Sequence, residues 1–227
     1  SYYLYLTLYL QQKFINRKLI LPVVLGIVTI FFFRNYVIIA MLPAMLTAML
    51  CKILPYRKRW IVLSSYAVFF MLFFLSGVVS SSFNMPAAVV QRKADFVALG
   101  EAKTNISMNE LLPNAQSFII NLPQAINHSL FRPYLWEFTQ LSVLLTAMEL
   151  IFYQLLILAF ILFRKKDGPP VHNFNIFGFA LFLNMMLIIG YTIPNVGAIV
   201  RYRSIFWIFL ICPLVGNIQW KKLFLNK

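Results

Sequence analysis

Six apolar runs, separated by short clusters of lysine and arginine, constrain the fold of this chain more than any other feature. The runs cover residues 19–33, 36–54, 60–80, 141–163, 174–193 and 204–216. A helix needs about 20 apolar residues to cross the roughly 30 Å hydrocarbon core of a bilayer. The first and last runs are shorter, so we expect them to tilt or to recruit flanking residues. The pattern predicts an all-α protein, a polytopic transmembrane helix bundle.

The composition excludes a water-soluble globule. Hydrophobic residues make up 61% of the chain and charged residues only 11%, which leaves too little polar surface to cover a soluble domain. Lysine and arginine number 20 against 6 acidic residues, an excess that in a soluble protein would indicate nucleic acid. Here the basic residues lie between apolar runs, so we expect membrane lipids as partners and no nucleic acid.

The basic clusters predict the topology. If every run crosses once, the clusters within 13–18, 52–59, 164–166 and 221–227 all lie on one face. Short cytoplasmic loops carry an excess of lysine and arginine, so we assign this face and the C-terminus to the cytoplasm, and the chain to a bacterial inner membrane. The opposite face receives residues 81–140, whose charges balance, and we predict one extracytoplasmic helical segment there.

The chain is interpreted as a single transmembrane domain over residues 1–227. Its first ten residues are apolar but too short to cross a bilayer, so we expect them to be the end of a membrane helix that begins before Ser1. No phosphate-binding glycine loop, metal-binding pattern or nucleophile motif is present in the sequence. We therefore expect no cofactor and no metal.

Two patterns within residues 81–140 predict local structure. Ser107 and Glu110 have the spacing of a capping box, which predicts a helix start at that point. Farther on, apolar residues recur at helical spacing but are interrupted by Pro123, which predicts two short amphipathic helices. An ordinary packed surface helix is the alternative.

Arg201 and Arg203 depart from the charge rule, because they stand on the predicted outer face in a loop immediately before the last run. A guanidinium offers a rigid fork of donors that matches phosphate or carboxylate. We predict that both arginines are substrate-binding residues that grip an anionic head group. The alternative is that they only extend to lipid phosphates and anchor the last helix.

A second candidate site is the stretch Arg132-Pro-Tyr-Leu-Trp-Glu137, at the point where the external segment re-enters the membrane. Arg132 and Glu137 are predicted to contact substrate, with a lipid-linked saccharide or phosphate held between Arg132 and the arginines of the 192–203 loop. The alternative is an exposed charge pair with Tyr134 and Trp136 in an interfacial aromatic belt.

Glu149 is the only acidic residue within a predicted span. It lies roughly 12 Å beyond Leu141 at about 1.5 Å per helical residue, and acids at such depth usually face a bundle interior or a cavity. A general base, a proton carrier and a structural partner for an arginine are the roles left open, and we name it as the candidate catalytic residue. Asn184 in the next span is expected to join helices by hydrogen bonds.

The order of these features, with Arg132-Pro-Tyr-Leu-Trp-Glu137 followed by Glu149 and then Asn195-Val-Gly-Ala-Ile-Val-Arg-Tyr-Arg203, resembles polytopic membrane proteins of bacteria, especially Bacteroidota, that are associated with cell-surface polysaccharide assembly. It is also similar to membrane-embedded polymerases and lipid-sugar-dependent glycosyltransferases. The resemblance covers roughly the last 110 residues and implies a polyprenyl-diphosphate-linked saccharide as the partner of the outer-face arginines.

The leading hypothesis is therefore an inner-membrane protein that handles a lipid-linked anionic glycan intermediate at the outer leaflet, as a polymerase or glycosyltransferase does. The alternative is a non-catalytic structural subunit of a larger membrane complex, which would bind partner membrane proteins. A transporter is the third hypothesis, and in it Glu149 would control proton or ion flux.

Overall fold

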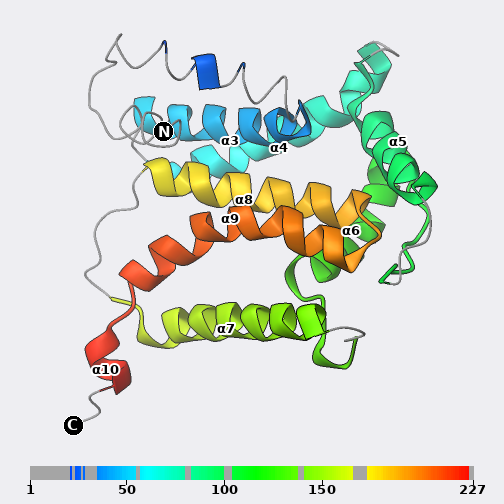
Figure 1. Cartoon of the computed structure of the whole chain (residues 1–227). Helices are drawn as coiled ribbons and strands as arrows, with labels where there is room; N and C mark the ends of the chain where they lie inside the picture. Colours follow the sequence, from blue (N-terminus) through cyan, green and yellow to red (C-terminus); the bar gives the residue numbers. More distant parts are fainter. Residues whose placement is uncertain are drawn as a thin grey trace. The chain divides into compact units, whose positions relative to one another are not determined.

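The structure is a computed structural model, and it describes residues 21, 24–26, 28, 35–54, 57–79, 83–99, 104–137, 141–165 and 173–224. Over these residues the chain is helical and has no β-strand (Figure 1). The longer helices are α3 (Asn35–Ile53), α4 (Lys58–Val79), α5 (Met85–Ala98), α6 (Ala115–Leu130), α7 (Leu141–Phe163), α8 (Asn173–Thr192) and α9 (Val196–Gly216), and the short ones are η3 (Leu135–Glu137) and α10 (Trp220–Phe224). Most of the predicted run 19–33 lies outside the described residues.

Four helices in the described part of the chain are long and apolar enough to cross a membrane, namely α4, α7, α8 and α9. Helix α3 contains a shorter apolar stretch, Val37–Ile53. These helices confirm the prediction of an all-α, multi-pass membrane protein. The membrane in question and the side on which the C-terminus lies stay predictions.

Helix α9 begins at Val196, so the predicted loop before the last run is wrong. Asn195 caps the helix, because its side chain accepts a hydrogen bond from the backbone N–H of Ala198 (3.2 Å). Hydropathy placed the start of the span after the two arginines because charge interrupts the apolar run. Arginine is nevertheless a good helix former, and Arg201 and Arg203 both lie inside the helix.

Helix α6 begins at Ala115 rather than at Ser107, so the capping-box prediction is also wrong. Asn114 caps it by accepting a hydrogen bond from the backbone N–H of Ser117 (2.8 Å). A helix begun at Ser107 would have to pass Pro113, which disfavours helical backbone in the preceding residue and clashes with the preceding turn.

The predicted break of α6 into two helices at Pro123 is likewise wrong, since one helix runs through Pro123. A proline inside a helix leaves the carbonyl four residues before it, here that of Ile119, without its usual donor. Pro123 and Ile119 both lie on the exposed face of α6, where a solvent or lipid-head-group donor is within reach of that carbonyl.

The chain divides into two compact units. One contains residues Ser1–Leu72 and Pro170–Asn184, and the other contains Phe73–Pro169 and Met185–Lys227. We call them the first and the second unit. The predicted site residues all belong to the second unit.

In the first unit, α3 presents small residues to its neighbours, and Ala44, Ala48 and Cys51 are fully buried. Small side chains at such spacing let membrane helices approach closely. Asn184 donates to the carbonyl oxygen of Ala40 (2.8 Å) and accepts from the hydroxyl of Tyr66 (3.2 Å). The predicted role of Asn184 in joining helices is confirmed, since its side chain connects α8 with α3 and α4.

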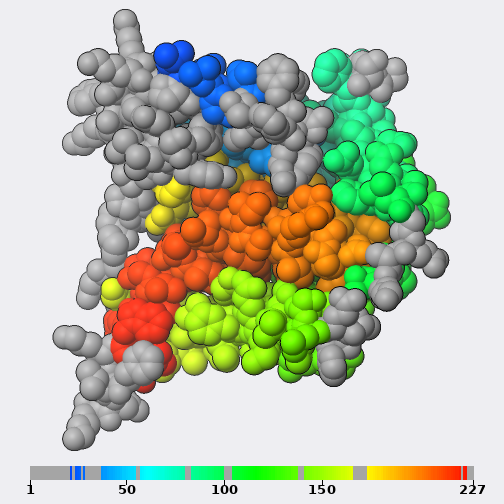
Figure 2. Space-filling model, in the orientation of Figure 1, coloured from blue at the N-terminus to red at the C-terminus, as the bar shows by residue number. Residues whose placement is uncertain are grey.

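In the second unit, α7 and α9 lie side by side and run in the same direction (Figure 1). Their last residues meet, because Arg164 pairs with Ile218 as an isolated bridge and the N–H of Gln219 donates to the carbonyl of Phe163 (2.8 Å). At the first turn of α9, Asn195 pairs with Asn105, which ties the segment before α6 to the turn between α8 and α9. Figure 2 shows the side chains of α7 and α9 packed against each other along the pair.

Candidate functional site

Arg203 is the central residue of the candidate site. It lies in α9, it is only 2% exposed, and its Nη1 donates hydrogen bonds to the carbonyl oxygens of Ser129 (3.0 Å) and Arg132. Ser129 is in the last turn of α6, where carbonyl groups lack helical partners and carry the negative end of the helix dipole. The guanidinium therefore satisfies the end of α6 from within the protein.

Arg132 and Glu137 form an ion pair with 2.9 Å between Nη2 and Oε1, and their side chains are 22% and 23% exposed. Glu137 also accepts a hydrogen bond from the backbone N–H of Tyr134 (3.1 Å) through its second oxygen. The charge pair, which the sequence left as an alternative, is thus present. Because both side chains remain partly accessible, the pair leaves room for a further polar contact.

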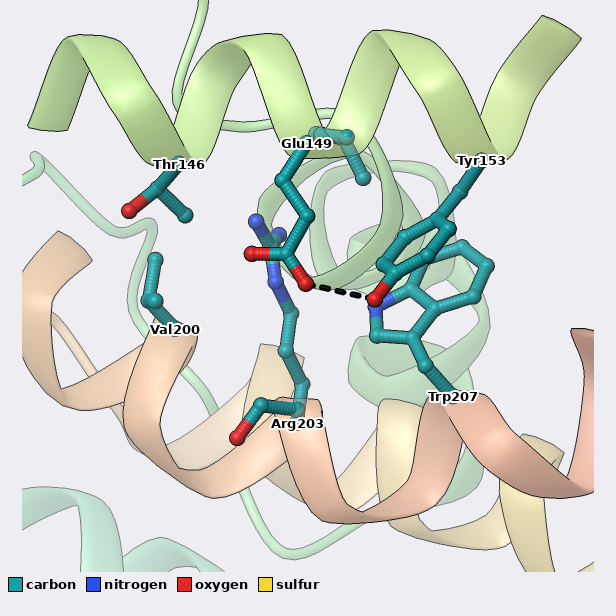
Figure 3. Close-up of a pocket in the computed structure, with 8 residues that line it drawn as sticks. Thr146, Glu149, Tyr153, Val200, Arg203 and Trp207 are labelled. Atoms are coloured by element: carbon teal, nitrogen blue, oxygen red, sulfur yellow. Dashed lines mark hydrogen bonds between the residues drawn. The ribbon is translucent and has the colours of Figure 1, made fainter.

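A shallow groove lies between α7 and α9, and four of its lining residues follow the same register (Figure 3). The sequence distance from Glu149 to Arg203 equals that from Tyr153 to Trp207, as expected for two parallel helices in contact. The hydroxyl of Tyr153 donates to Glu149 Oε1 (2.5 Å), and its ring stacks on Trp207 with centroids 4.9 Å apart. Thr146, Leu150, Val200 and Ser204 complete the lining.

Glu149 lies in a candidate membrane span as predicted, and its side chain points from α7 into the open groove toward α9 (Figure 3). The groove is open, so the side chain remains exposed. Arg203 exerts an electrostatic attraction on Glu149, although no ion pair within 4 Å joins them among the described residues. The arrangement fits the predicted role of structural partner for an arginine at longer range.

The groove is too small to enclose a saccharide. It offers about 210 Å³ of space, including its open mouth, whereas pockets that bury ligands measure roughly 300–1,000 Å³. Among the described residues, the groove that the carboxylate lines is therefore not an enclosed substrate cavity. A catalytic role for Glu149 stays a prediction.

Arg201 points away from Arg203, so the two arginines do not form one site. Residues two apart on a helix lie about 200° apart around its axis, and Arg201 is exposed where Arg203 is buried. The guanidinium carbon of Arg201 lies 5.1 Å from the ring centroid of Tyr202, within the range of a cation–π contact. The prediction that both grip one head group arose from placing them on a loop.

Arg201 belongs to a row of cations and rings that the sequence analysis missed. Tyr202 meets Phe96 of α5 edge to face with centroids 6.4 Å apart, and Arg92 lies over Phe96 at 5.5 Å. We call Arg92, Phe96, Tyr202 and Arg201 the arginine–aromatic row. The only sequence signal for it is the helical i, i+4 spacing of Arg92 and Phe96, since the pairing of α5 with α9 is a tertiary contact.

Four of the five predicted site residues are therefore connected. Glu149 is attracted to Arg203, Arg203 binds the backbone of Arg132, and Arg132 pairs with Glu137. Arg201 stands apart, in the arginine–aromatic row. The buried His128 and the half-buried Lys93 adjoin this chain of contacts. Burial, with Arg132 and Lys93 nearby, lowers the pKa of His128 to about 4. Burial also lowers the pKa of Lys93, against the opposing effect of Glu110.

No group of three or more histidine, cysteine, aspartate or glutamate side chains able to hold a metal ion occurs in the described parts of the chain. Compared with protein-family models, with curated proteins and with solved structures, the chain matches none of them.

Proposed function

We propose that this multi-pass membrane protein binds a lipid-linked anionic glycan intermediate at the outer leaflet, and that the arginine–aromatic row holds its phosphate. The observation that carries the proposal is the row itself. Two exposed guanidinium groups, Arg92 on α5 and Arg201 near the start of α9, are backed by Phe96 and Tyr202.

The chemistry of the row suits a phosphate at a membrane surface. Each guanidinium can donate two parallel hydrogen bonds to a phosphate, and charge-assisted bonds of this kind are stronger than neutral ones. The ring beneath each arginine limits its side-chain motion, so less conformational entropy is lost when an anion binds. Arg201 lies roughly 8 Å from the start of α9 at about 1.5 Å per residue, a depth from which an arginine reaches lipid phosphates.

In this proposal the other predicted residues have supporting roles. Arg203 and the ion pair of Arg132 with Glu137 hold the end of α6, since the Arg203 Nη1 is occupied by backbone carbonyls. Glu149 faces a different side of α9 from Arg201. The proposal therefore assigns binding of the lipid-linked intermediate to this chain and assigns no bond-making step to a residue.

The test is lipid binding by the protein in nanodiscs, measured by native mass spectrometry with undecaprenyl diphosphate and with phosphatidylcholine. We expect the Arg92→Ala/Arg201→Ala variant to bind undecaprenyl diphosphate at least about tenfold more weakly, since loss of about 1.4 kcal/mol suffices for that factor. Phosphatidylcholine should be retained equally by all variants.

Arg59→Ala is the matched control. Arg59 is exposed and lies 6.0 Å from the ring centroid of Trp60, so its removal deletes the same charge from a similar contact at the predicted cytoplasmic end. Equal loss of undecaprenyl diphosphate in Arg59→Ala and in the single variant Arg201→Ala would mean that net charge alone attracts the lipid, and the proposal would fail.

A second candidate function, a structural subunit of a membrane complex, is favoured by Glu149. Its Oε1 accepts from Tyr153, and no described residue donates to its Oε2. A charged residue at the centre of a span costs about 2.5–3.5 kcal/mol, which a donor from a neighbouring protein's helix that reaches the open groove would offset. Co-purification of a stoichiometric membrane protein that is lost in Glu149→Ala but kept in Arg201→Ala would favour this function.

A further inference from the structure

We propose that Trp136 and Tyr134 form a platform on which a pyranose ring of the bound glycan stacks. This inference rests on the function proposed above, because it names the part of the protein that contacts the saccharide once the phosphate is held elsewhere. We call the two rings the aromatic platform.

The platform is a pair of parallel rings with one open face. The centroids of Tyr134 and Trp136 are 4.6 Å apart and the ring planes differ by only 11°. Trp136 is 77% exposed, so its indole is accessible on the side away from Tyr134. An indole is the largest aromatic surface that a side chain provides, and its negatively charged π face attracts the weakly positive C–H bonds on one face of a pyranose.

Tyr134 is fixed from three directions, which makes the platform rigid. Its hydroxyl donates to Asn127 Oδ1 of α6 (2.5 Å), its backbone N–H donates to Glu137 (3.1 Å), and the guanidinium of Arg132 lies 5.9 Å from its ring centroid. Rings that are held before the ligand arrives lose little conformational entropy on binding. Trp136 therefore stacks on a Tyr134 ring that is already held in place before the sugar binds.

Polar groups stand beside the platform where the hydroxyl edge of a sugar would lie. Arg132 and Glu137 are partly exposed and paired at 2.9 Å. A guanidinium donates and a carboxylate accepts, so together the two can bind both a donor and an acceptor on neighbouring sugar hydroxyls. A flat aromatic face next to a charged donor–acceptor pair matches a ligand with one C–H face and a polar rim.

The hydroxyl of Tyr134 argues against a simple membrane anchor. In an interfacial aromatic belt the polar edges of the rings point to head groups and water, whereas the Tyr134 hydroxyl bonds to Asn127 inside the protein. The platform also precedes α7 directly, and α7 and α9 run in the same direction with their ends matched. It therefore lies at the same end of the helix pair as Arg201.

The test is saturation-transfer NMR on the full chain in nanodiscs, with the methyl glycosides of glucose, galactose, mannose and N-acetylglucosamine as separate probes. We expect transfer to the ring C–H protons of at least one glycoside. Transfer should be lost in Trp136→Ala and largely kept in Trp136→Phe, which retains a flat ring. Trp60→Ala is the control, since Trp60 is another exposed tryptophan at the predicted cytoplasmic end.

The result that overturns the inference is absence of transfer to all four glycosides, or transfer that Trp136→Ala leaves unchanged. Failure of the proposed function would give a different result in this experiment. Uncharged glycosides do not need Arg201, so the Arg92→Ala/Arg201→Ala variant should keep the saccharide contact even where its lipid binding has changed. The chain has four tryptophans, so the fluorescence of Trp136 is taken as the part that is lost in Trp136→Phe. Quenching of this part by brominated acyl chains, without transfer to any glycoside, would make the platform a membrane anchor only.

Discussion

The guanidinium of Arg203 in α9 donates a 3.0 Å hydrogen bond to the backbone carbonyl oxygen of Ser129 in α6. The same nitrogen also donates to the carbonyl of Arg132, and the side chain is buried. One cation therefore binds both the last turn of α6 and the start of the segment that leads to η3. This connection makes the position of α6 depend on a residue far away in the sequence.

We predict that Arg203→Met destabilises the protein by about 2–4 kcal/mol, because the buried carbonyl of Ser129 and the part-buried carbonyl of Arg132 would lose their donor, and a fully buried unsatisfied group costs about 1–3 kcal/mol. The measurement is thermal unfolding in detergent, together with hydrogen exchange of the α6 amides, which should become faster. Arg201→Met is the control, since Arg201 is exposed. Equal stability of the two variants would contradict a structural role for Arg203.

Gly190 provides the contact between α8 and α6. A Cβ atom at this position would lie 2.0 Å from the carbonyl oxygen of Ala125 and 2.7 Å from its carbonyl carbon. Both are backbone atoms, so no side-chain rotation relieves the overlap. We predict that Gly190→Ala separates α6 from α8 and destabilises the second unit by about 1–3 kcal/mol, the usual range for overpacking.

Gly216→Ala is the matched control for Gly190→Ala. A Cβ atom there meets nothing within 4 Å, and Gly216 ends α9. Alanine in a helix is usually more stable than glycine by roughly 0.5–1 kcal/mol, so this variant should match or exceed the wild type. Hydrogen exchange of the α6 amides, compared in the two variants, provides a local measurement, and equal exchange would count against the contact.

Asn184 is expected to stabilise the first unit through its two hydrogen bonds. Asn184→Leu removes both the bond to the Ala40 carbonyl and the bond from Tyr66, and interhelical bonds of this kind contribute about 0.6 kcal/mol on average in membranes. We predict a loss of about 1 kcal/mol in denaturant unfolding from mixed micelles. Tyr66→Phe removes only one of the bonds, so it should show a smaller loss, and an effect equal to that of Asn184→Leu would contradict this account.

His128 predicts a pH dependence for the packing of α6. Burial first, and then the charges of Arg132 and Lys93, lower its pKa from 6.5 to about 4, and its Nδ1 has no hydrogen-bond partner among the described residues. When α6 separates from its neighbours and His128 is exposed to water, which we call the open form, His128 binds a proton at a higher pH than it does in the packed, closed form. The packing is most stable above the ordinary pKa and loses stability as the pH falls from 6.5 towards 4, by at most about 3 kcal/mol.

The measurement is hydrogen exchange of the α6 amides over this pH range, corrected for intrinsic rates and compared with His128→Gln. Glutamine cannot take up the proton, so opening of α6 should depend less on pH in the variant. Other titrating groups are the same in both proteins and cancel in the difference. Identical pH profiles would show that His128 does not titrate between the open and closed forms.

The hydropathy and charge of the sequence were enough to predict those helices that depend on local composition alone. The bounds of α7 agree with the predicted run, and α4 and α8 differ from theirs by a few residues, because an apolar stretch of that length in a bilayer must satisfy its own backbone as a helix. The place of Glu149 within a span followed from the same argument. Asn184 was recognised because an amide in an apolar helix needs a polar partner.

Only the tertiary structure decided which residues meet. Ser107 and Glu110 have the spacing of a helix start, yet the helix begins after Asn114, because residues 104–106 pair with the turn that precedes α9. Arg201 and Arg203 look alike in sequence, but one is exposed and the other buried against α6. That difference arises from the 100° turn per helical residue and from the presence of α6 on one side of α9. The local sequence around the two arginines does not show which side of α9 another helix will cover.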